Sequence, residues 1–319
     1  MRELTIQTND AGQRLDKFLL KAVPALPAAL MYKFIRLKKI KVNRARTEQG
    51  YILQKGDVVA LFIKEEFFDE AAADLSFTKL APRLQVLYED DNLLLCDKRP
   101  GLIVHSDQAE QTNTLISHIK AYLYRKGEYN PESEQSFAPA LCNRIDRNTG
   151  GIVMAAKNAQ TLRILNEKIK NKEIIKKYLC VLHGAPDKKE GVLEGYLVKD
   201  ALTNQVTVYD QNPGGRAKEI KTAYRILKEK SGMALAEVTL ITGRTHQIRA
   251  HFAHIGHPLL GDGKYGVNGQ DKKRGYKFQA LYSYQLTFAF QDENALSYLS
   301  GRTFEVEPEK IWFIKEFES

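Results

Sequence analysis

One aspartate in this chain lies in a setting suited to chemistry. Residues 143–151 read Asn-Arg-Ile-Asp-Arg-Asn-Thr-Gly-Gly, which places Asp146 between Arg144 and Arg147 and just before a glycine turn. Neighbouring cations favour the ionised carboxylate, and an ionised, oriented aspartate can act as a nucleophile or a base. The alternative is a structural Arg–Asp ion pair on a surface loop, because such pairs also occur without function.

The segments around this aspartate are expected to hold it beside the core. The apolar run 152–156 follows at once and is typical of a buried strand. In the predicted strand 176–184, Tyr178 could stack on a flat ring, move a proton through its hydroxyl, or simply pack in the core. Residues 242–252 predict a turn that leads from a strand into a helix and brings Arg244, His246 and Arg249 together.

Four of the seven histidines lie in one short stretch, which raises the alternative of a metal-dependent hydrolase. They are His246, His251, His254 and His257. No two of them have the i, i+4 spacing of helical zinc motifs, and no cysteine or carboxylate completes a tight set, so we expect no metal. The chain also has no P-loop and no Gly-x-Gly-x-x-Gly motif, so we expect no nucleotide cofactor.

The charge is unevenly distributed along the 319 residues, a length that suits two domains. Residues 1–64 hold 13 Lys and Arg against 5 Asp and Glu, whereas the remainder holds 35 against 34. A basic first part is typical of nucleic-acid binding. We see no apolar run of membrane-spanning length, no amphipathic anchor and no signal-peptide core, and three dispersed cysteines suit a reducing compartment, so we expect a cytoplasmic protein that does not bind membranes.

Residues 1–64 predict two short helices, 14–20 and 28–37, followed by short strands at 40–43, 51–53 and 58–63. We place Leu30, Phe34 and Leu37 on the inward face of the second helix. Order and spacing resemble the small RNA-binding domain of ribosomal protein S-four, which implies binding to structured RNA. The alternative is a merely solvated basic face. The candidate phosphate-binding residues on and after the second helix are Lys33, Arg36, Lys38, Lys39, Lys41 and Arg44.

The aspartate stretch resembles His-Arg-Leu-Asp-Arg-x-Thr-Ser-Gly, the signature of the RluA family of RNA pseudouridine synthases, with Asn143 and Gly150 in place of the histidine and the serine. Residues 243–251 resemble that family's Gly-Arg-Thr-His-Gln-Ile-Arg-x-His, and residues 256–262 its Gly-His-Pro-x-x-Gly-Asp. Residues 278–286 resemble its closing strand, with Tyr282 where the family has a histidine. The resemblance spans roughly residues 84–290.

This resemblance implies an isomerase that converts uridine to pseudouridine and needs neither cofactor nor metal. It implies that Asp146 is the catalytic residue, that Arg249 pairs with it, and that Tyr178 lies in the same cleft. The route stays open between attack on the anomeric carbon and assistance to the departing base. The residues expected to contact the RNA in this domain are Arg144, Arg147, Arg244 and His246.

The resemblance favours large-subunit ribosomal RNA as the substrate, with transfer RNA possible, and a monomer is our default for an enzyme that docks on bulky RNA. A non-catalytic RNA-binding or ribosome-assembly factor is the alternative. Strands outnumber helices and several follow one another with short turns, so the fold class is α+β, a mixed, largely antiparallel sheet with flanking helices. We expect a small α/β RNA-binding domain at 1–64, a linker at 65–82 and a catalytic domain at 83–319.

Overall fold

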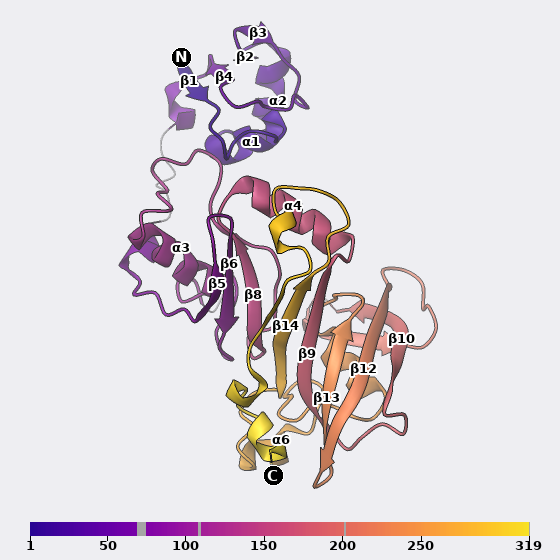
Figure 1. The fold of residues 1–319 in the computed structure, drawn as a ribbon. Coiled ribbons are helices and arrows are strands. Elements are labelled where there is room, and N and C mark those ends of the chain that lie inside the picture. The colour runs from indigo at the N-terminus through magenta and orange to yellow at the C-terminus, as the bar shows by residue number, and fades with distance from the viewer. Residues whose placement is uncertain (69–74, 108–109, 201, 319) are drawn as a thin grey trace. The chain divides into compact units, whose positions relative to one another are not determined.

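The structure is a computed structural model that describes residues 1–68, 75–107, 110–200 and 202–318. The chain forms two compact units (Figure 1). The first comprises Met1–Arg83, Ile116–Ala140 and Ala156–Arg163, and the second comprises Leu84–Leu115, Leu141–Ala155 and Ile164–Ser319. No helix in the described ranges is long and apolar enough to cross a membrane.

The N-terminal part of the first unit is a four-stranded sheet, in the order β1-β4-β2-β3, packed with two helices. The paired strands are antiparallel, and the buried apolar side chains of this region form a core of their own. The elements are β1 (Arg2–Thr5), α1 (Leu15–Ala22), α2 (Ala28–Arg36), β2 (Ile40–Val42), β3 (Ala45–Arg46) and β4 (Val58–Leu61). Both predicted helices are present, but β1 was not foreseen, and residues 51–53 contribute only a single bridge, Arg14 to Ile52.

The buried face of α2 differs from the predicted one. Met31 and Ile35 are buried, whereas Leu37 is 55% exposed. Leu30 and Phe34 are half-buried at the edge of the core. The prediction was wrong because the apolar residues of α2 cover more than one face, so spacing alone could not choose between them.

Part of the expected linker has structure of its own. Two short 3-10 helices, η1 (Glu65–Phe68) and η2 (Ser76–Lys79), lie in this region, and residues 69–74 are outside the described residues. Phe77 is buried and stacks on Tyr129, with ring centroids 5.9 Å apart. Composition alone had indicated a tether without regular structure, and the burial of Phe77 depends on a ring 52 positions away in the sequence.

The second unit is built on a large mixed sheet whose main path runs β11-β10-β12-β13-β9-β14-β8-β6-β5 (Figure 1). The pairings from β11 through to β14 are antiparallel, and β14 pairs with β8 in parallel. This confirms the predicted α+β class with a mixed, largely antiparallel sheet. The strands are β5 (Val86–Glu89), β6 (Leu93–Lys98), β7 (Ala140–Leu141), β8 (Gly150–Ala156), β9 (Ile174–His183), β10 (Glu190–Lys199), β11 (Val206–Tyr209), β12 (Lys218–Lys230), β13 (Met233–Leu240), β14 (Leu281–Phe288) and β15 (Thr303–Glu305).

The remaining helices are α3 (Leu115–Arg125), α4 (Ala159–Lys170), α5 (Gln247–His254) and α6 (Asn268–Lys273). Asn158 caps the N-terminus of α4, since its side chain accepts a hydrogen bond from the Thr161 amide at 2.8 Å. Near the C-terminus, Phe313 is buried in the core of the second unit, and Trp312 packs edge-on against Tyr276. The residues that position the candidate site come from β6, β8, β9, β14 and α5.

Candidate active site and RNA-binding surface

Asp146 and Arg249 are joined by a direct ion pair, as the sequence predicted. Arg249 donates from Nη1 to Asp146 Oδ2 at 2.7 Å. The same guanidinium donates from Nε and Nη2 to the two carboxylate oxygens of Asp262, at 2.7 and 2.8 Å. In the part of the chain that the structure describes, no hydrogen-bond donor reaches Asp146 Oδ1. One oxygen of Asp146 is therefore clamped, and the other is available to a ligand.

The exposed fraction of the side chain increases from Asp262 to Arg249 to Asp146. The side chain of Asp262 is 0% exposed, that of Arg249 is 8% exposed and that of Asp146 is 26% exposed. Burial opposes the charge on Arg249, but the Asp262 and Asp146 carboxylates outweigh it, and the pKa of Arg249 is raised. Arg249 therefore remains a cation, and its two-point contact with Asp262 fixes the direction in which the third bond reaches Asp146.

The beginning of α5 explains how Arg249 reaches this position. Thr242 and Gln247 hold the loop between β13 and α5, because the Gln247 side-chain oxygen accepts from the Thr242 hydroxyl at 2.9 Å and from the Arg244 amide at 3.1 Å. Gln247 also donates to Thr222 on β12 at 2.9 Å. The first turn of α5 is thereby attached to the sheet two residues before Arg249.

A buried lysine is hydrogen-bonded to the backbone of the aspartate loop. Lys98, at the end of β6, is 1% exposed, and its Nζ donates to the carbonyl oxygens of Arg147, Leu102 and Arg99 at 3.0, 2.8 and 3.1 Å. Burial lowers the pKa of Lys98 to about 7, against the opposing effects of Asp146 and Asp97. Three carbonyl acceptors match the three N–H bonds of an ammonium group. Lys98 thus ties the residue next to Asp146 to the turn that follows β6.

The two departures from the family signature have structural explanations. Asn143 accepts the Met154 amide at 2.8 Å, so its side chain closes the loop onto β8. Gly150 faces Tyr282 on β14, and a Cβ atom at this position would lie 2.7 Å from Tyr282 Cδ2 and closer still to Cε2. Tyr282, which stands where the family has histidine, donates to Asp97 at 2.5 Å. The small residue and the large ring are therefore complementary.

Tyr178 reaches the site from β9, two strands away from β8. Its register neighbour Ser283 on β14 is also the register neighbour of Gly151 on β8. Tyr178 is 5% exposed, and burial raises its pKa to about 12, with Asp146 adding to the shift. The hydroxyl is therefore protonated at neutral pH, and Tyr178 can stack or donate a hydrogen bond but cannot serve as a resting base.

His246 lies beside the aspartate as well. Its Nε2 is 3.8 Å from Asp146 Oδ2, and its Nδ1 is 2.9 Å from the Tyr265 hydroxyl. The residue caps α5 with φ 53°, a left-handed conformation that costs a histidine about 1 to 2 kcal/mol. Burial lowers the pKa of His246 below its ordinary value.

The three arginines predicted to contact RNA lie on the surface. Arg144, Arg147 and Arg244 are exposed. The guanidinium of Arg147 donates to Asp107 at 2.9 Å. The surface-loop ion pair considered from the sequence exists, but it is made by Arg147 with Asp107.

Sequence reasoning assigned no role to Asp262, Lys98 or Tyr265. Asp262 was visible only as the last residue of the Gly-His-Pro-x-x-Gly-Asp stretch. A useful signal was the placement of this acidic residue within residues 258–263, which are otherwise apolar or glycine.

The clustered histidines do not converge on one point. His251 contacts Thr222, His254 contacts Asp210 and His257 contacts the carbonyl of His183, at 3.0, 2.8 and 3.0 Å. Among the described residues, no three histidine, cysteine, aspartate or glutamate side chains form a group that could hold a metal ion.

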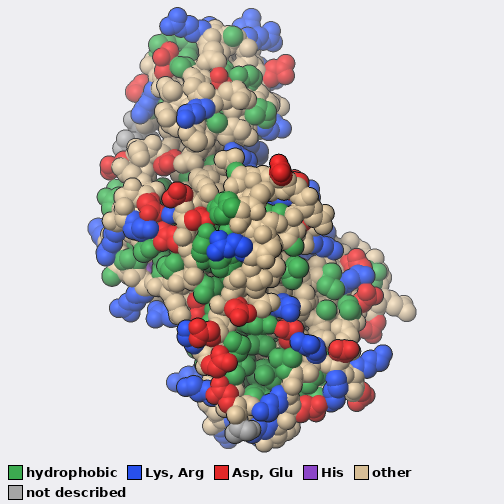
Figure 2. All heavy atoms as spheres, in the orientation of Figure 1, with side chains coloured by type: hydrophobic (Ala, Val, Ile, Leu, Met, Phe, Trp, Pro, Cys, Tyr) green, Lys and Arg blue, Asp and Glu red, His purple; other side chains and the backbone are tan. Residues whose placement is uncertain are grey.

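The basic residues predicted in the first unit lie on its surface. They occupy α2, the turn after it, β2 and the following turn: Lys33, Arg36, Lys38, Lys39, Lys41 and Arg44. All are exposed except Lys41, which is half-buried. Figure 2 shows Lys and Arg side chains over the surface of this unit, at the top of that view. Such a surface can neutralise several phosphates of an RNA.

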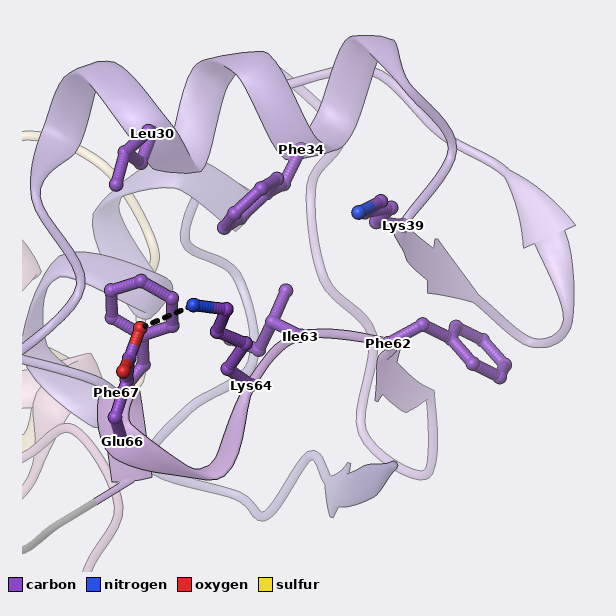
Figure 3. A pocket seen from close by; sticks show the side chains of 8 residues that line it. All are labelled: Leu30, Phe34, Lys39, Phe62, Ile63, Lys64, Glu66 and Phe67. Atoms are coloured by element: carbon purple, nitrogen blue, oxygen red, sulfur yellow. Dashed lines mark ion pairs between the residues drawn. The ribbon is translucent and has the colours of Figure 1, made fainter.

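A pocket of about 480 Å³ borders this basic surface (Figure 3). Lys39 lines it, with Nζ 5.5 Å from the centroid of the Phe34 ring, and Phe34 meets Phe67 edge-on. The other lining residues are Leu30, Phe62, Ile63, Lys64 and Glu66. It contains none of the residues around Asp146, so the pocket is separate from the candidate active site.

Comparison with known proteins agrees with this geometry. The sequence profile of the family described as RNA pseudouridylate synthase matches residues 92–254, and that of the S4 domain matches residues 13–59. The chain is 31% identical over 289 residues to ribosomal large subunit pseudouridine synthase C of Haemophilus ducreyi, covering 89% of this chain and 86% of the relative. It is 32% identical over 286 residues to an uncharacterized RNA pseudouridine synthase of Mycoplasma genitalium, covering 87% and 86%.

Solved structures show the same fold. Human RNA pseudouridylate synthase domain containing 4 aligns with a TM-score of 0.54 at 22% identity, over 70% of this chain and 87% of the human one. Human RNA pseudouridylate synthase domain containing 1 aligns with a TM-score of 0.53 at 17% identity, over 72% and 95%.

Proposed function

The chain belongs to the RNA pseudouridylate synthase family, and we propose that it isomerises uridine to pseudouridine in large-subunit ribosomal RNA. The observation that carries the activity is the clamped carboxylate of Asp146, with Oδ2 on Arg249 at 2.7 Å. Support for ribosomal RNA comes from the name of the Haemophilus ducreyi relative and from the S4 domain, which suits structured RNA.

In the proposed reaction the target uridine leaves its stack, because its sugar is otherwise out of reach. Tyr178 stacks on the extruded uracil. Its hydroxyl is neutral, so the negative charge of the site is carried by Asp146. Asp146 acts on the ribose, either by attacking the anomeric carbon or by assisting departure of the base. Arg249 holds the Asp146 carboxylate in a fixed direction in both routes. The uracil turns and is rejoined to the sugar through C5, and in the attack route the bond between Asp146 and the anomeric carbon breaks as this bond forms. C5 then loses its proton to solvent and N1 takes one up, so no atom is gained or lost overall.

The proposed RNA contacts divide between the two units. Arg144, Arg147 and Arg244 contact the backbone around the extruded nucleotide, and the basic residues of α2 and β2 hold a folded part of the same RNA. Backbone contacts of this kind position a substrate without reading its sequence.

We also propose the division of the chain into an RNA-binding domain at 1–64, a linker at 65–82 and a catalytic domain at 83–319. The proposed enzyme is a monomer that works in the cytoplasm, where its substrate is made. Light scattering of the purified protein, alone and with RNA, checks the monomer: a mass near 36.2 kDa without RNA is expected, and a doubled mass contradicts it.

Pseudouridine mapping tests the substrate. Cells without the gene should lack one or more pseudouridines in large-subunit ribosomal RNA. A plasmid copy should restore them, and the Asp146→Asn copy should not. Loss of a transfer RNA pseudouridine instead would overturn the ribosomal assignment. Restoration by the Asp146→Asn copy would favour the second candidate, a non-catalytic ribosome-assembly factor that enables another enzyme.

A further inference from the structure

The contacts around His246 favour one tautomer of its neutral ring. The Tyr265 hydroxyl receives the Val206 amide at 3.0 Å and lies 2.9 Å from His246 Nδ1. The amide can only donate, so of these two neighbours only the Nδ1 lone pair can take the phenolic proton. A proton on Nε2 also places an N–H group, and not a lone pair, near the Asp146 carboxylate. Both contacts favour a neutral His246 that carries its proton on Nε2.

This Nε2–H group lies near the Asp146 oxygen that Arg249 holds. It lies 3.8 Å from Asp146 Oδ2, beyond hydrogen-bond distance, and the described residues place no acceptor within that distance. The imidazole is 9% exposed, and its left-handed backbone at the start of α5 holds it in a fixed direction. It is a preorganised donor whose acceptor is missing from the protein.

We propose that His246 donates a hydrogen bond from Nε2 to the O2 carbonyl of the departing uracil, an inference that rests on the proposed function. When the bond between N1 and the anomeric carbon breaks, its electron pair remains on the base and is shared between N1 and O2. O2 is two bonds from N1, so it lies close to the sugar carbon on which Asp146 acts. A donor beside Asp146 is placed to stabilise this charge as it develops. No proton needs to be transferred in this step.

The surroundings favour a donor over a base. The charged and titratable groups that face His246 are Asp146, Arg249, Asp262, Lys264 and Tyr265. Burial lowers the pKa of His246, so the imidazole is neutral at pH 7, with Nε2 protonated and unable to accept a proton. Protonation at lower pH adds a proton to Nδ1 and leaves the Nε2–H donor in place.

Single-turnover isomerisation of a ribosomal RNA fragment, with RNA affinity measured in parallel, tests this role. His246→Ala should slow the reaction by about 10²-fold with RNA affinity unchanged. His246→Gln, whose amide nitrogen can donate from a similar place, should recover most of that loss. Tyr265→Phe removes the hydroxyl that favours this tautomer, and its rate should fall between those of the two His246 variants. The pH dependence of His246→Gln should match that of the wild type.

Four outcomes would overturn the proposal. The first three are a normal rate in His246→Ala, an equal defect in His246→Gln and His246→Ala, and a loss confined to RNA affinity. The fourth is a wild-type rate that falls at acidic pH together with a His246→Gln rate that does not, which would indicate that His246 acts as a base. Failure of the proposed function looks different, because the wild-type protein itself would then leave ribosomal RNA unmodified.

Discussion

Arg249 serves two carboxylates at once, and this sharing explains how Asp146 is held. A buried guanidinium with a single weak partner would be unfavourable, because its desolvation is not offset. The fork to Asp262 supplies that compensation inside the protein and leaves Nη1 for the partly exposed Asp146. Asp262 thus stabilises the buried Arg249 guanidinium, and Arg249 in turn orients Asp146.

Replacing Arg249 by lysine tests the geometry separately from the charge. Lysine keeps the cation but has no planar fork, so it cannot hold Asp262 by two bonds and Asp146 by a third. We expect Arg249→Lys to reduce the single-turnover rate by about 10²-fold, the usual cost of a misplaced reactive group, with RNA affinity unchanged. A rate near that of the wild type would show that charge alone is sufficient.

The Asp262–Arg249 pair also predicts a pH dependence of stability. Burial raises the pKa of Asp262, but the Arg249 contacts outweigh it and hold the pKa below its ordinary value. A lowered folded-state pKa contributes stability above the unfolded pKa of about 3.9, and this stability is lost as pH falls through the folded value. Asp262→Asn should therefore lower the free energy of unfolding by about 3 kcal/mol at pH 7.

Urea unfolding at several pH values measures this contribution. The difference between wild type and Asp262→Asn should be constant from pH 7 down to about 5 and should shrink below about 4. A difference that does not depend on pH would mean that the loss comes from packing and not from the carboxylate charge.

The pairing of β8 with β14 controls where the aspartate loop ends. Gly151, with φ 111°, lies so close to Ser283 that a Cβ atom would be 2.6 Å from the Ser283 nitrogen. Gly150 makes room for the Tyr282 ring in the same way. The chain can therefore bring β8 and β14 together only with these small residues, and Asp146 is four residues from that contact.

A double-mutant cycle tests the complementarity of Gly150 and Tyr282. Gly150→Ser should destabilise the protein by about 2 kcal/mol, because the added atoms overlap the ring. Combining it with Tyr282→His, which restores the pair found in the family signature, should recover at least about 1 kcal/mol of that loss. Tyr282→Phe is the control, since it keeps the ring but removes the bond to Asp97. Additive losses in thermal unfolding would contradict a direct clash.

Elements with strong local signals were predictable. α1, α2, β9 and α5 lie where the sequence predicted a helix or a strand, although the buried face of α2 differs, and the resemblance located Asp146, Arg249 and Tyr178. β1 was missed because it has four residues, none of them buried, so it lacks the alternating pattern that identifies a strand.

The residues that hold Asp146, Arg249 and His246 in place could not be predicted from local sequence. Lys98 is buried because three carbonyl oxygens accept its hydrogen bonds, and one of these belongs to Arg147, 49 positions away. The partners of Asp262 and Tyr265 are likewise fixed by tertiary structure. A lysine or an aspartate usually predicts exposure, and only the folded chain shows which ones have buried partners.

At the scale of the whole molecule, we expect a large part of RNA binding to depend on a different region of the chain from the chemistry. The excess positive charge lies in residues 1–64, whereas the residues around Asp146 belong to the second unit. Binding through phosphates releases counterions, so it weakens with salt, whereas the reaction of bound RNA does not depend on this step. The two activities should therefore be separable by substitution.

Neutralising two adjacent lysines should show this separation. Lys38→Gln combined with Lys39→Gln should weaken RNA binding and reduce the slope of log affinity against log salt by about 1.5, with the single-turnover rate at saturating RNA unchanged. Lys188→Gln combined with Lys189→Gln, an exposed pair in the second unit, is the matched control and should leave the slope unchanged. Equal effects of the two pairs would indicate only a general dependence on net charge.

Asp146→Asn offers the most direct test of the central claim. The amide has nearly the same shape but no negative charge, so the variant should fold and bind RNA like the wild type. Single-turnover isomerisation of ribosomal RNA should fall by at least about 10³-fold. A turnover rate within about tenfold of the wild type, with RNA binding intact, would contradict the account, because the reaction would not depend on the carboxylate that Arg249 holds.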